Sequence, residues 1–328
     1  MTTHKRFGIL GIGSYIPEKV LTNHDLEQMV ATTDEWITTR TGIKERRLCA
    51  PDETASTMGA EAARRALADA GLQPADIDLV VCCTFSPDNL CPSTACHIIR
   101  QLGIQRAALD VNAACTGFVY GLATAHGMLQ TGLARRALVI GTEALSRVID
   151  WTDRSTCVIF ADGAGAVVLG EVDGDRGILS EFLMADGSAT DLIIIPAGGS
   201  AKPITPEALA NREHCLRMSG NEVFKFAVRI LGEAVDEVLR KAGLTHNDID
   251  WLVPHQANIR IIDAAAKRTH VPRERIAVNI DRVGNTSAAS IPLALDDIYR
   301  AGKIKRGDVI ALVAFGAGLT WGATLLRW

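Results

Sequence analysis

The chain contains an internal repeat, and this duplication restricts the folds that are open to it. Residues 70–78 (AGLQPADID) are echoed 172 positions later by residues 242–250 (AGLTHNDID). Each copy follows a predicted helix and precedes an apolar strand. At an offset of 170, the turn around Cys115 is echoed by residues 278–287, which places Asn285 opposite Cys115. Because both copies join helices and strands in the same order, the repeat predicts two similar α/β halves.

A looser repeat and a polar turn locate the two halves. Residues 163–169 recur approximately at 321–326, and Asp173-Gly174-Asp175 is the best candidate for a boundary. A single hydrophobic core stops growing near about 250–300 residues, so 328 residues fit two core units or one large duplicated domain. Pro292 should kink or shorten the second helix unless it lies in an early turn. We therefore predict an N-terminal half at residues 1–173 and a C-terminal half at residues 174–328.

The composition excludes several classes of protein. The net charge is −4 and no block of Lys or Arg stands out, so general binding to nucleic acid or to a membrane surface is not expected. The eight cysteines are irregularly spaced without a Cys-x-x-Cys pair, which indicates a reducing cytosol and neither disulfides nor structural zinc. The longest apolar run, 309–319, is shorter than the ~18 residues of a membrane span, and the N-terminal apolar run lacks a signal-peptide cleavage site. We therefore expect a soluble cytoplasmic protein.

Cys115 lies where a predicted strand turns into a helix. Residues 107–111 are an apolar strand, and the apolar positions after the turn recur at helical spacing, at Phe118, Leu122, Ala125 and Leu129. Free N–H groups and the helix dipole at such a turn favour an anion, so we expect the thiol to ionise more easily than its usual pKa near about 8.5 allows. This position suits a nucleophile. The alternative is a small buried residue without a chemical role, which is common for a free cysteine.

His255 occupies a matching position in the second half. It follows an apolar strand at 251–254, which the repeat makes equivalent to the strand that ends near Cys83. Ligands of α/β sheets bind outside the carboxyl ends of the strands. If the halves pack around a two-fold axis, Cys115, His255 and Asn285 converge there. A lone histidine at a strand end is more often structural, but three such residues at related turns indicate a catalytic site.

Four motifs carry a specific resemblance. They are Asn-Ala-Ala-Cys-Thr-Gly-Phe at 112–118, Pro-His-Gln-Ala-Asn at 254–258, Gly-Asn-Thr-Ser-Ala-Ala-Ser at 284–290 and Phe-Gly-Ala-Gly-Leu-Thr-Trp-Gly at 315–322. The chain resembles the β-ketoacyl-[acyl-carrier-protein] synthase III family. This implies the thiolase fold, with two duplicated halves in five layers (α-β-α-β-α), and a homodimer. It also implies an acyltransferase that starts type II fatty-acid synthesis by condensing an acyl-CoA primer with malonyl-acyl carrier protein, releasing CO2 and CoA. Acyl-CoA is then a substrate, and no metal or cofactor is expected.

The same resemblance assigns catalytic roles. Cys115 would attack the primer thioester and hold the acyl group, while the backbone N–H groups of Cys115 and Ala317 would bind the oxyanion. Relatives commonly have Gly where this chain has Ala317, but a backbone donor survives that change. His255 and Asn285 would stabilise the enolate that forms when malonate loses CO2. A thiolase is disfavoured because residues 315–318 contain no second Cys, and an elongating synthase is disfavoured because it uses two His.

The resemblance also assigns three groups of binding residues. The CoA contacts are Trp36, Arg40, Arg154, Phe224 and Asn258. The residues that dock the acidic carrier protein are Lys225, Arg260, Lys267 and Arg268. The acyl-pocket residues are Cys91 and Phe160. Relatives often place Phe at the position of Cys91, where the side chain crosses the dimer interface and closes the partner's pocket. A smaller side chain leaves more room, so we expect primers longer than acetyl to be accepted.

Three alternative functions share parts of this pattern. A related condensing enzyme of polyketide, quinolone or long-chain ketone synthesis would carry the same motifs. A papain-type hydrolase uses Cys, His and Asn, but the α/β duplication and the lack of a visible leader or pro-segment disfavour it. A noncatalytic acyl-CoA binding protein would have no need of an activated Cys115. Rapid labelling of Cys115 by iodoacetamide would disfavour this last alternative.

Overall fold

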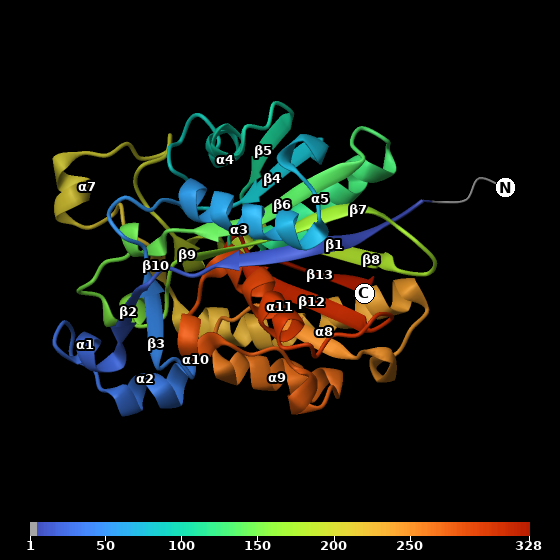
Figure 1. The fold of residues 1–328 in the computed structure, drawn as a ribbon. Helices are drawn as coiled ribbons and strands as arrows, with labels where there is room; N and C mark the ends of the chain where they lie inside the picture. Colours follow the sequence, from blue (N-terminus) through green and yellow to red (C-terminus); the bar gives the residue numbers. More distant parts are fainter. Residues whose placement is uncertain (1–4) are drawn as a thin grey trace.

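The computed structural model describes residues 5–328, and most of their strands form two sheets (Figure 1). The first sheet has the order β1-β7-β6-β4-β5, with the bounds β1 Arg6–Tyr15, β4 Leu79–Cys83, β5 Ala107–Val111, β6 Arg136–Glu143 and β7 Gly163–Val172. The second has the order β11-β12-β13-β8, with the bounds β8 Gly177–Ala185, β11 Trp251–Pro254, β12 Val309–Gly316 and β13 Thr320–Arg327. Counted from β1 and from β8, the first two strand pairings of each sheet are antiparallel and the third is parallel. This shared topology confirms the predicted duplication.

Helices form three layers around the two sheets. The outer helices are α3 Ala55–Ala70 and α4 Thr94–Leu102 on the first sheet, and α8 Gly220–Ala242 on the second, with α9 Ile259–Thr269 packed beside it. The helices between the sheets are α5 Gly117–Gln130 and α11 Ser290–Arg300. The central cluster of buried side chains draws on both sheets and on both of these helices. The layers therefore run α-β-α-β-α, as expected from the resemblance.

The remaining elements are short and connect the layers. The short strands are β2 Lys19–Thr22, β3 Glu45–Leu48, β9 Ile193–Ile194 and β10 Arg217–Met218. The short helices are α1 Asn23–Glu27, α2 Asp34–Thr41, α6 Arg154–Cys157, α7 Pro206–Ala210 and α10 Ile280–Val283. The 3-10 turns are η1 Pro74–Asp76, η2 Ala114–Thr116, η3 Leu145–Arg147, η4 Gly187–Leu192, η5 His246–Asp248, η6 Arg273–Arg275 and η7 Ser287–Ala289. Among residues 5–328, no helix has both the length and the apolar character that crossing a membrane requires.

The same local rules end the outer helix of each half. Thr54 caps the start of α3, because its hydroxyl accepts the backbone N–H of Thr57. α3 ends at Gly71 (φ 65°) and α8 ends at Gly243 (φ 67°), two left-handed positions that favour glycine. Each glycine leads through a 3-10 turn into a buried parallel strand, β4 or β11. The repeat at an offset of 172 therefore marks, in each half, the end of the outer helix and the start of the parallel strand that follows it.

The turn between β5 and α5 corrects the predicted register of the second repeat. Ala114 and Ser287 both have positive φ (47° and 49°), and both open a 3-10 turn that leads into a helix of the middle layer. The side-chain oxygens of Asn112 and Asn285 accept the N–H groups of Ala114 and Ser287, respectively. The true offset is therefore 173, and Asn285 matches Asn112.

Ala288, and not Asn285, therefore holds the place of Cys115 in the second half. The prediction of an offset of 170 was wrong because the second sheet has no counterpart of the full strand β5. A single bridge between Leu252 and Ile276 takes its place, and helix α10 follows where residues 278–280 were expected to be extended. β6 and β12 obey the offset of 173 at both of their ends.

Pro292 and the turn at 173–175 complete the comparison of the halves. Pro292 is the third residue of α11, so it lies in the early turn where proline is tolerated. The turn at 173–175 joins β7, in the first sheet, to β8, in the second. A boundary at this turn fits the change of sheet and stays a prediction.

Candidate active site

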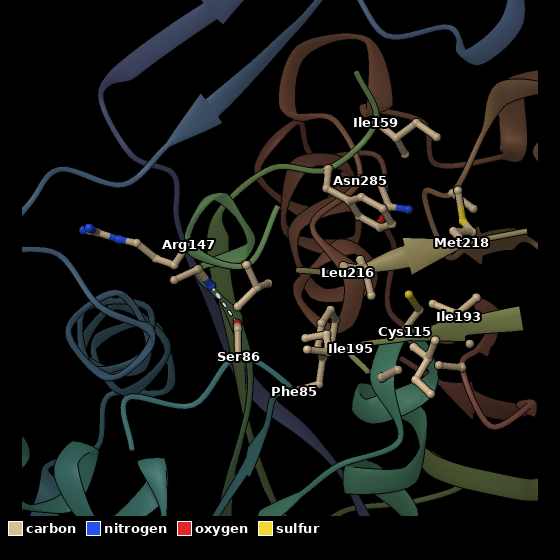
Figure 2. A pocket seen from close by; sticks show the side chains of 18 of the residues that line it. Phe85, Ser86, Cys115, Arg147, Ile159, Ile193, Ile195, Leu216, Met218 and Asn285 are labelled. Carbon is tan, nitrogen blue, oxygen red and sulfur yellow. Dashed lines mark hydrogen bonds between the residues drawn. The ribbon is translucent and has the colours of Figure 1, made fainter. Parts of the chain in front are cut away.

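A cavity of about 1340 Å³ collects the residues that follow the parallel strands. Cys115 lies in the turn after β5, His255 follows β11, and Asn285 forms a bridge with Phe160. All three predicted catalytic residues line this cavity, as does Ala317, which follows β12. Figure 2 shows Cys115 and Asn285 on the wall of the same space. The two halves thus bring the three side chains to one site.

The backbone around Cys115 packs against the end of β12. A Cβ atom at Gly316 would lie 2.8 Å from the backbone nitrogen of Cys115 and 3.0 Å from that of Thr116, so glycine is required for this close approach. The hydroxyl oxygens of Thr116 and Thr320 lie 3.0 Å apart and join the same two segments. The sequence reasoning missed this pair of threonines, although both belong to the quoted motifs.

Burial changes the expected chemistry of Cys115. Part of the side chain is exposed to the cavity, but its sulfur lies deep in the protein. Burial is the main cause that raises the pKa of the thiol to about 12, while the nearby Ser287 side chain lowers it and the charge of Glu143 raises it. The expectation of an easily ionised thiol is therefore wrong for the protein without substrate. Loss of hydration outweighs the favourable field of the helix end.

His255 is a buried, neutral imidazole. Burial lowers its pKa to about 3, so the ring carries no charge at neutral pH. The ring packs edge-on against Phe315, with the ring centroids 5.7 Å apart. Its Nδ1 atom lies 2.6 Å from Ser290 Oγ, which leaves Nε2 as the nitrogen for the cavity.

The amide of Asn285 is oriented by its own turn. Its Oδ1 atom accepts the N–H of Ser287 at 2.9 Å, so the NH2 group remains as a donor for the cavity. The side chain is 5% exposed, which keeps water from competing strongly for that donor. A neutral amide beside a neutral imidazole suits the stabilisation of a developing negative charge.

The comparison with known proteins agrees with this geometry. The family model described as 3-oxoacyl-[acyl-carrier-protein (ACP)] synthase III matches residues 109–187, and the model of its C-terminal region matches residues 239–328. A β-ketoacyl-[acyl-carrier-protein] synthase III of Caldanaerobacter subterraneus subsp. tengcongensis is 53% identical over 322 residues, which are 98% of this chain and 97% of that protein. This chain belongs to the β-ketoacyl-[acyl-carrier-protein] synthase III family. It is therefore a condensing acyltransferase, and its five layers are the thiolase fold.

Solved structures give the same result. The 3-oxoacyl-[acyl-carrier-protein] synthase III of Aquifex aeolicus VF5 has a TM-score of 0.91 at 46% identity and covers 98% of this chain and 100% of its own. The priming β-ketosynthase of the R1128 polyketide pathway also has a TM-score of 0.91, at 37% identity, and covers 100% of this chain and 98% of its own. This synthase fold therefore occurs in proteins of both fatty-acid and polyketide pathways.

Glu143 supports the wall of the cavity from behind and was not predicted from the sequence. It is 0% exposed and accepts hydrogen bonds from Thr84 Oγ1 at 3.0 Å, Ser86 N at 3.1 Å and Phe85 N at 3.3 Å. Burial raises its pKa to about 7, although these hydrogen bonds oppose the shift. The carboxyl group therefore holds the loop after β4, which lines the cavity at Phe85. A lone acid at the end of an otherwise apolar strand was the available signal.

Four of the five predicted CoA contacts line the cavity, and Arg154 packs against one of them. Trp36 and Arg40 line it, as do Phe224 and Asn258. The guanidinium of Arg154 lies 4.7 Å from the centre of the Trp36 ring and donates to the carbonyl of Ala31. These two side chains stack on each other directly, so an adenine ring can enter between them only if Arg154 moves.

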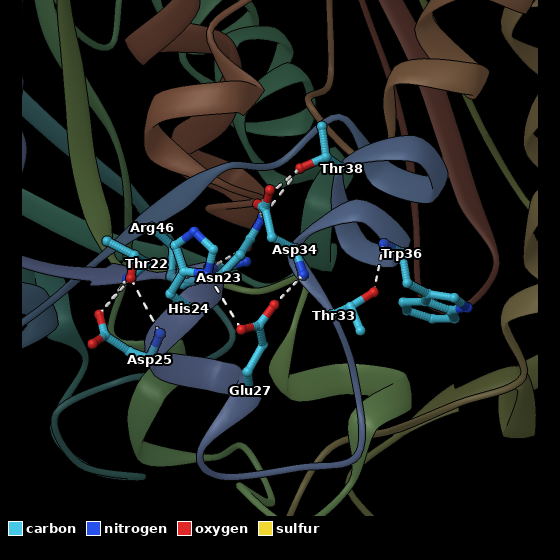
Figure 3. A network of polar contacts seen from close by, with 10 residues as sticks. All are labelled: Thr22, Asn23, His24, Asp25, Glu27, Thr33, Asp34, Trp36, Thr38 and Arg46. Atoms are coloured by element: carbon cyan, nitrogen blue, oxygen red, sulfur yellow. Dashed lines mark hydrogen bonds and ion pairs between the residues drawn. The ribbon is translucent and has the colours of Figure 1, made fainter.

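A buried polar network holds the helix that carries Trp36 (Figure 3). Thr33 caps α2 by accepting the N–H of Trp36 at 3.1 Å. Asn23, at the start of α1, donates a hydrogen bond to Asp34 of α2. Its side-chain oxygen accepts a hydrogen bond from Arg46 at 2.9 Å. Arg46 is 0% exposed and also donates to the carbonyl of Val158, so the network ties α2 to the segment after α6.

The four predicted docking residues are all exposed, and one of them also pairs within the chain. The guanidinium of Arg260 stacks 4.9 Å from the centre of the Phe224 ring, while Lys225 and Lys267 extend the same exposed set. Arg268 lies across Gly232 of α8 and pairs with Asp236 at 3.6 Å, so an ion pair at the surface offsets part of its charge.

The apolar part of the cavity lies beyond Cys115. It is lined by Phe85, Val148, Phe160, Ile193, Ile195, Leu216 and Met218, many of which are seen in Figure 2. The short strands β9 and β10 supply two of these side chains, Ile193 and Met218, and Ile195 and Leu216 flank the strands. Phe160 lines this cavity, and its role in an acyl pocket stays a prediction, while Cys91 is exposed and does not line the cavity of its own chain.

Proposed function

We propose that this synthase condenses an acyl-CoA primer with malonyl-acyl carrier protein to give 3-oxoacyl-acyl carrier protein, CoA and CO2. The observation that carries the proposal is the convergence of Cys115, His255 and Asn285 on one cavity of about 1340 Å³. The names of the relatives support an acyl carrier protein as the acceptor. Acyl-CoA acts as a substrate, and the proposed chemistry needs no further cofactor.

In the first half-reaction, the Cys115 sulfur attacks the thioester carbonyl of the primer. A bond forms between this sulfur and the acyl carbon, the bond from that carbon to the CoA sulfur breaks, and the thiol proton leaves with CoA. The backbone N–H groups of Cys115 and Ala317 bind the oxyanion, which the close approach at Gly316 supports. Because the thiol pKa is about 12 without substrate, ionisation has to accompany substrate binding.

In the second half-reaction, the malonyl group loses CO2 and leaves an enolate on its thioester. The NH2 group of Asn285 and Nε2 of His255 donate hydrogen bonds to the enolate oxygen. The enolate carbon then attacks the acyl carbon on Cys115, and the thiolate leaves and regains a proton. A neutral His255 fits this role, since decarboxylation creates the carbanion without a base.

The entrance residues serve the two substrates in turn. Trp36, Arg40, Arg154, Phe224 and Asn258 hold CoA. The acidic carrier protein docks on Lys225, Arg260, Lys267 and Arg268, and the exposed Arg229, one turn from Lys225 on α8, extends this surface. Arg229 stacks 5.7 Å from the centre of the Phe226 ring, which restricts its motion before docking.

The primer is proposed to extend beyond acetyl. The apolar lining from β9 and β10 gives room for a longer acyl chain, and Cys91 leaves the partner's pocket more open than Phe would. A Cys91→Phe variant should shift preference from octanoyl-CoA and butyryl-CoA towards acetyl-CoA. An unchanged preference among the three would contradict this assignment.

A homodimer in the cytoplasm fits the surface of the chain. β5 forms an edge of the first sheet, pairs only with β4 and leaves apolar side chains partly exposed. Leu90, next to Cys91, is 87% exposed. An edge strand and an exposed Leu favour burial against a second copy, because both are unfavourable in water. The eight cysteines are free thiols, as a reducing compartment requires.

Priming of a polyketide is the second candidate function. The likeness to the R1128 priming β-ketosynthase and the size of the cavity favour it. Both pathways use the same two half-reactions, so the primer and the carrier protein distinguish them.

Intact-mass spectrometry tests the proposal. Wild type mixed with acetyl-CoA should gain an acetyl group, which disappears into 3-oxobutanoyl-carrier protein when malonyl-carrier protein is added. Cys115→Ser should remain unacylated under the same conditions. An adduct from a longer acyl-CoA alone would favour the specialised pathway, and no adduct from any thioester would refute Cys115 as the nucleophile.

A further inference from the structure

Ser290 contacts His255 from outside the cavity. It is the first residue of α11, is 0% exposed and does not line the cavity. Its Oγ atom lies 2.6 Å from His255 Nδ1 and accepts the N–H of Gln256 at 3.3 Å. Within residues 5–328, the Ser290 hydroxyl has no other hydrogen-bond partner.

These contacts decide which nitrogen of the neutral imidazole carries the hydrogen. If Nδ1 of His255 donated to Ser290, the hydroxyl hydrogen of Ser290 would have no acceptor, and a buried unpaired donor costs about 1–3 kcal/mol. If Ser290 donates to Nδ1, every group at this contact is paired. The hydrogen of the imidazole then lies on Nε2, the nitrogen left for the cavity.

The backbone fixes the position of His255 relative to Ser290. His255 N–H donates to the carbonyl of Val313 at 2.8 Å. The side chain of Gln256 donates to the carbonyls of Pro254 and Ala277, and its oxygen accepts the N–H of Asn279. With the chain held on both sides of the histidine, the contact between Nδ1 and Ser290 restrains rotation of the ring.

We propose that Ser290 is a positioning residue that holds His255 as the Nε2–H tautomer, the form that donates to the enolate. The proposal rests on the condensing function above, because only the second half-reaction needs this donor. Ser290 acts through His255 and has no role in the attack by Cys115. Loss of the serine hydroxyl should therefore separate the two half-reactions.

The tautomer can be measured directly in the wild-type enzyme. Long-range ¹H–¹⁵N correlation spectra of enzyme labelled with [¹⁵N]histidine distinguish a protonated nitrogen from an unprotonated one, and His255→Ala identifies the signals. We expect His255 Nδ1 to be unprotonated and Nε2 to carry the hydrogen. A hydrogen on Nδ1 in the wild type would overturn the proposal, whether or not any Ser290 variant folds.

Ser290→Ala then tests the consequence for the reaction. Acylation of Cys115 by acetyl-CoA should stay within about threefold of wild type, and formation of the 3-oxoacyl product should fall about 10- to 100-fold. Thr324→Val is the matched control, because it removes a buried hydroxyl in β13 that has no partner in the described residues. It should keep both rates.

The possible outcomes separate this proposal from the proposed function. Equal losses in both half-reactions of Ser290→Ala, together with a lower melting temperature, would show a merely structural role and overturn the positioning role. Full activity of Ser290→Ala would overturn it as well. If wild type itself formed no 3-oxoacyl product, the proposed function would fail. The measured tautomer of His255 would still show whether Ser290 donates to Nδ1.

Discussion

The turns η2 and η7 share one backbone and carry different chemistry. Both open with a residue of positive φ, Ala114 or Ser287, and in both an Asn oxygen accepts the N–H of that residue. At the third position after the Asn, however, η2 has Cys115 and η7 has Ala288. Because the two turns share one backbone, a single side chain distinguishes the half that carries the proposed nucleophile.

The elements around the turns differ in the same way. His255 and Ser290 of the second half match Cys83 and Gly117 of the first, where a Cβ on the glycine would lie 3.3 Å from the Cys83 Cβ. Cys83 and Gly117 therefore also lie close together, but glycine has no side chain that could form a hydrogen bond. Likewise, β12 ends with Gly316, which makes room for a backbone N–H, and β6 ends with Glu143 at the matching position. Divergence at matched sites thus produced one asymmetric active site.

Moving the nucleophile to the other half should abolish the reaction. Cys115→Ala should lower condensation at least about 10³-fold, since the acyl group has no covalent carrier. Adding Ala288→Cys should not restore it, because Ala288 is 1% exposed and does not line the cavity. Intact-mass measurement after acetyl-CoA is added reports the adduct. An adduct on the double variant would show that the two turns are interchangeable.

Removing the matched amides should separate their roles. Asn285→Ala should lower product formation about 10²- to 10³-fold and leave the acetyl adduct on Cys115 in place, since a donor to the enolate is lost. Asn112→Ala removes the matching side chain, which is exposed, and should have a much smaller effect. Single-turnover assays of both half-reactions measure this. Comparable losses in the two variants would contradict the assignment of Asn285.

Glu143 should make stability depend on pH in a way that Gly316 cannot. Its folded pKa of about 7 lies above the usual 4.5, so the folded state retains the proton to a higher pH. Its contribution to stability is complete below pH 4.5 and is lost as the pH rises to about 7. The loss amounts to about 3 kcal/mol at most.

Glu143→Gln should remove this dependence, because an amide does not titrate there. Urea denaturation between about pH 4 and pH 8 gives the free energy of unfolding of both proteins. As the pH rises, that of wild type should fall relative to that of the variant. His255, whose pKa of about 3 gives stability above pH 6.5 that is lost as the pH falls, is common to both proteins and cancels. Parallel curves would refute the buried titration of Glu143.

Substitution of Gly71 and of Gly243, the residues that end α3 and α8, should lower stability by similar amounts. Both have φ near 66°, and no atom lies within 4 Å of a Cβ built at either position. Alanine at either site should therefore cost only the left-handed strain, about 1 kcal/mol. Thermal unfolding of Gly71→Ala, Gly243→Ala and the double variant should show two similar and additive losses. A difference of more than about 1 kcal/mol between the single variants would indicate unequal surroundings.

The sequence predicted two similar halves with a helix before each repeated segment, because these depend on local signals that occur twice. The five layers and the roles of the proposed catalytic residues followed instead from the family resemblance. Apolar periodicity and capping residues are short-range properties, so a helix before each repeated segment could be expected from the sequence. The register of the turn pair could not, since it depends on how many residues the missing strand and α10 use. The contacts of Glu143, the Thr116–Thr320 pair and the stack of Arg154 on Trp36 join segments far apart in the chain, so they form only when the chain folds.

The sequence by itself determined a duplicated α/β chain and placed Cys115, the proposed nucleophile, at one turn and the proposed donors His255 and Asn285 at a strand end and a turn of the other half. The tertiary structure decided the ionisation of those groups. Burial raises the thiol pKa of Cys115 to about 12 and lowers the imidazole pKa of His255 to about 3, opposite in direction to what the helix end alone suggests for the thiol. The contact between Ser290 Oγ and His255 Nδ1, on which the proposed tautomer rests, likewise forms only after folding. Hydration is lost only when both halves close around the cavity, so the energy that fixes these states does not exist in any local segment.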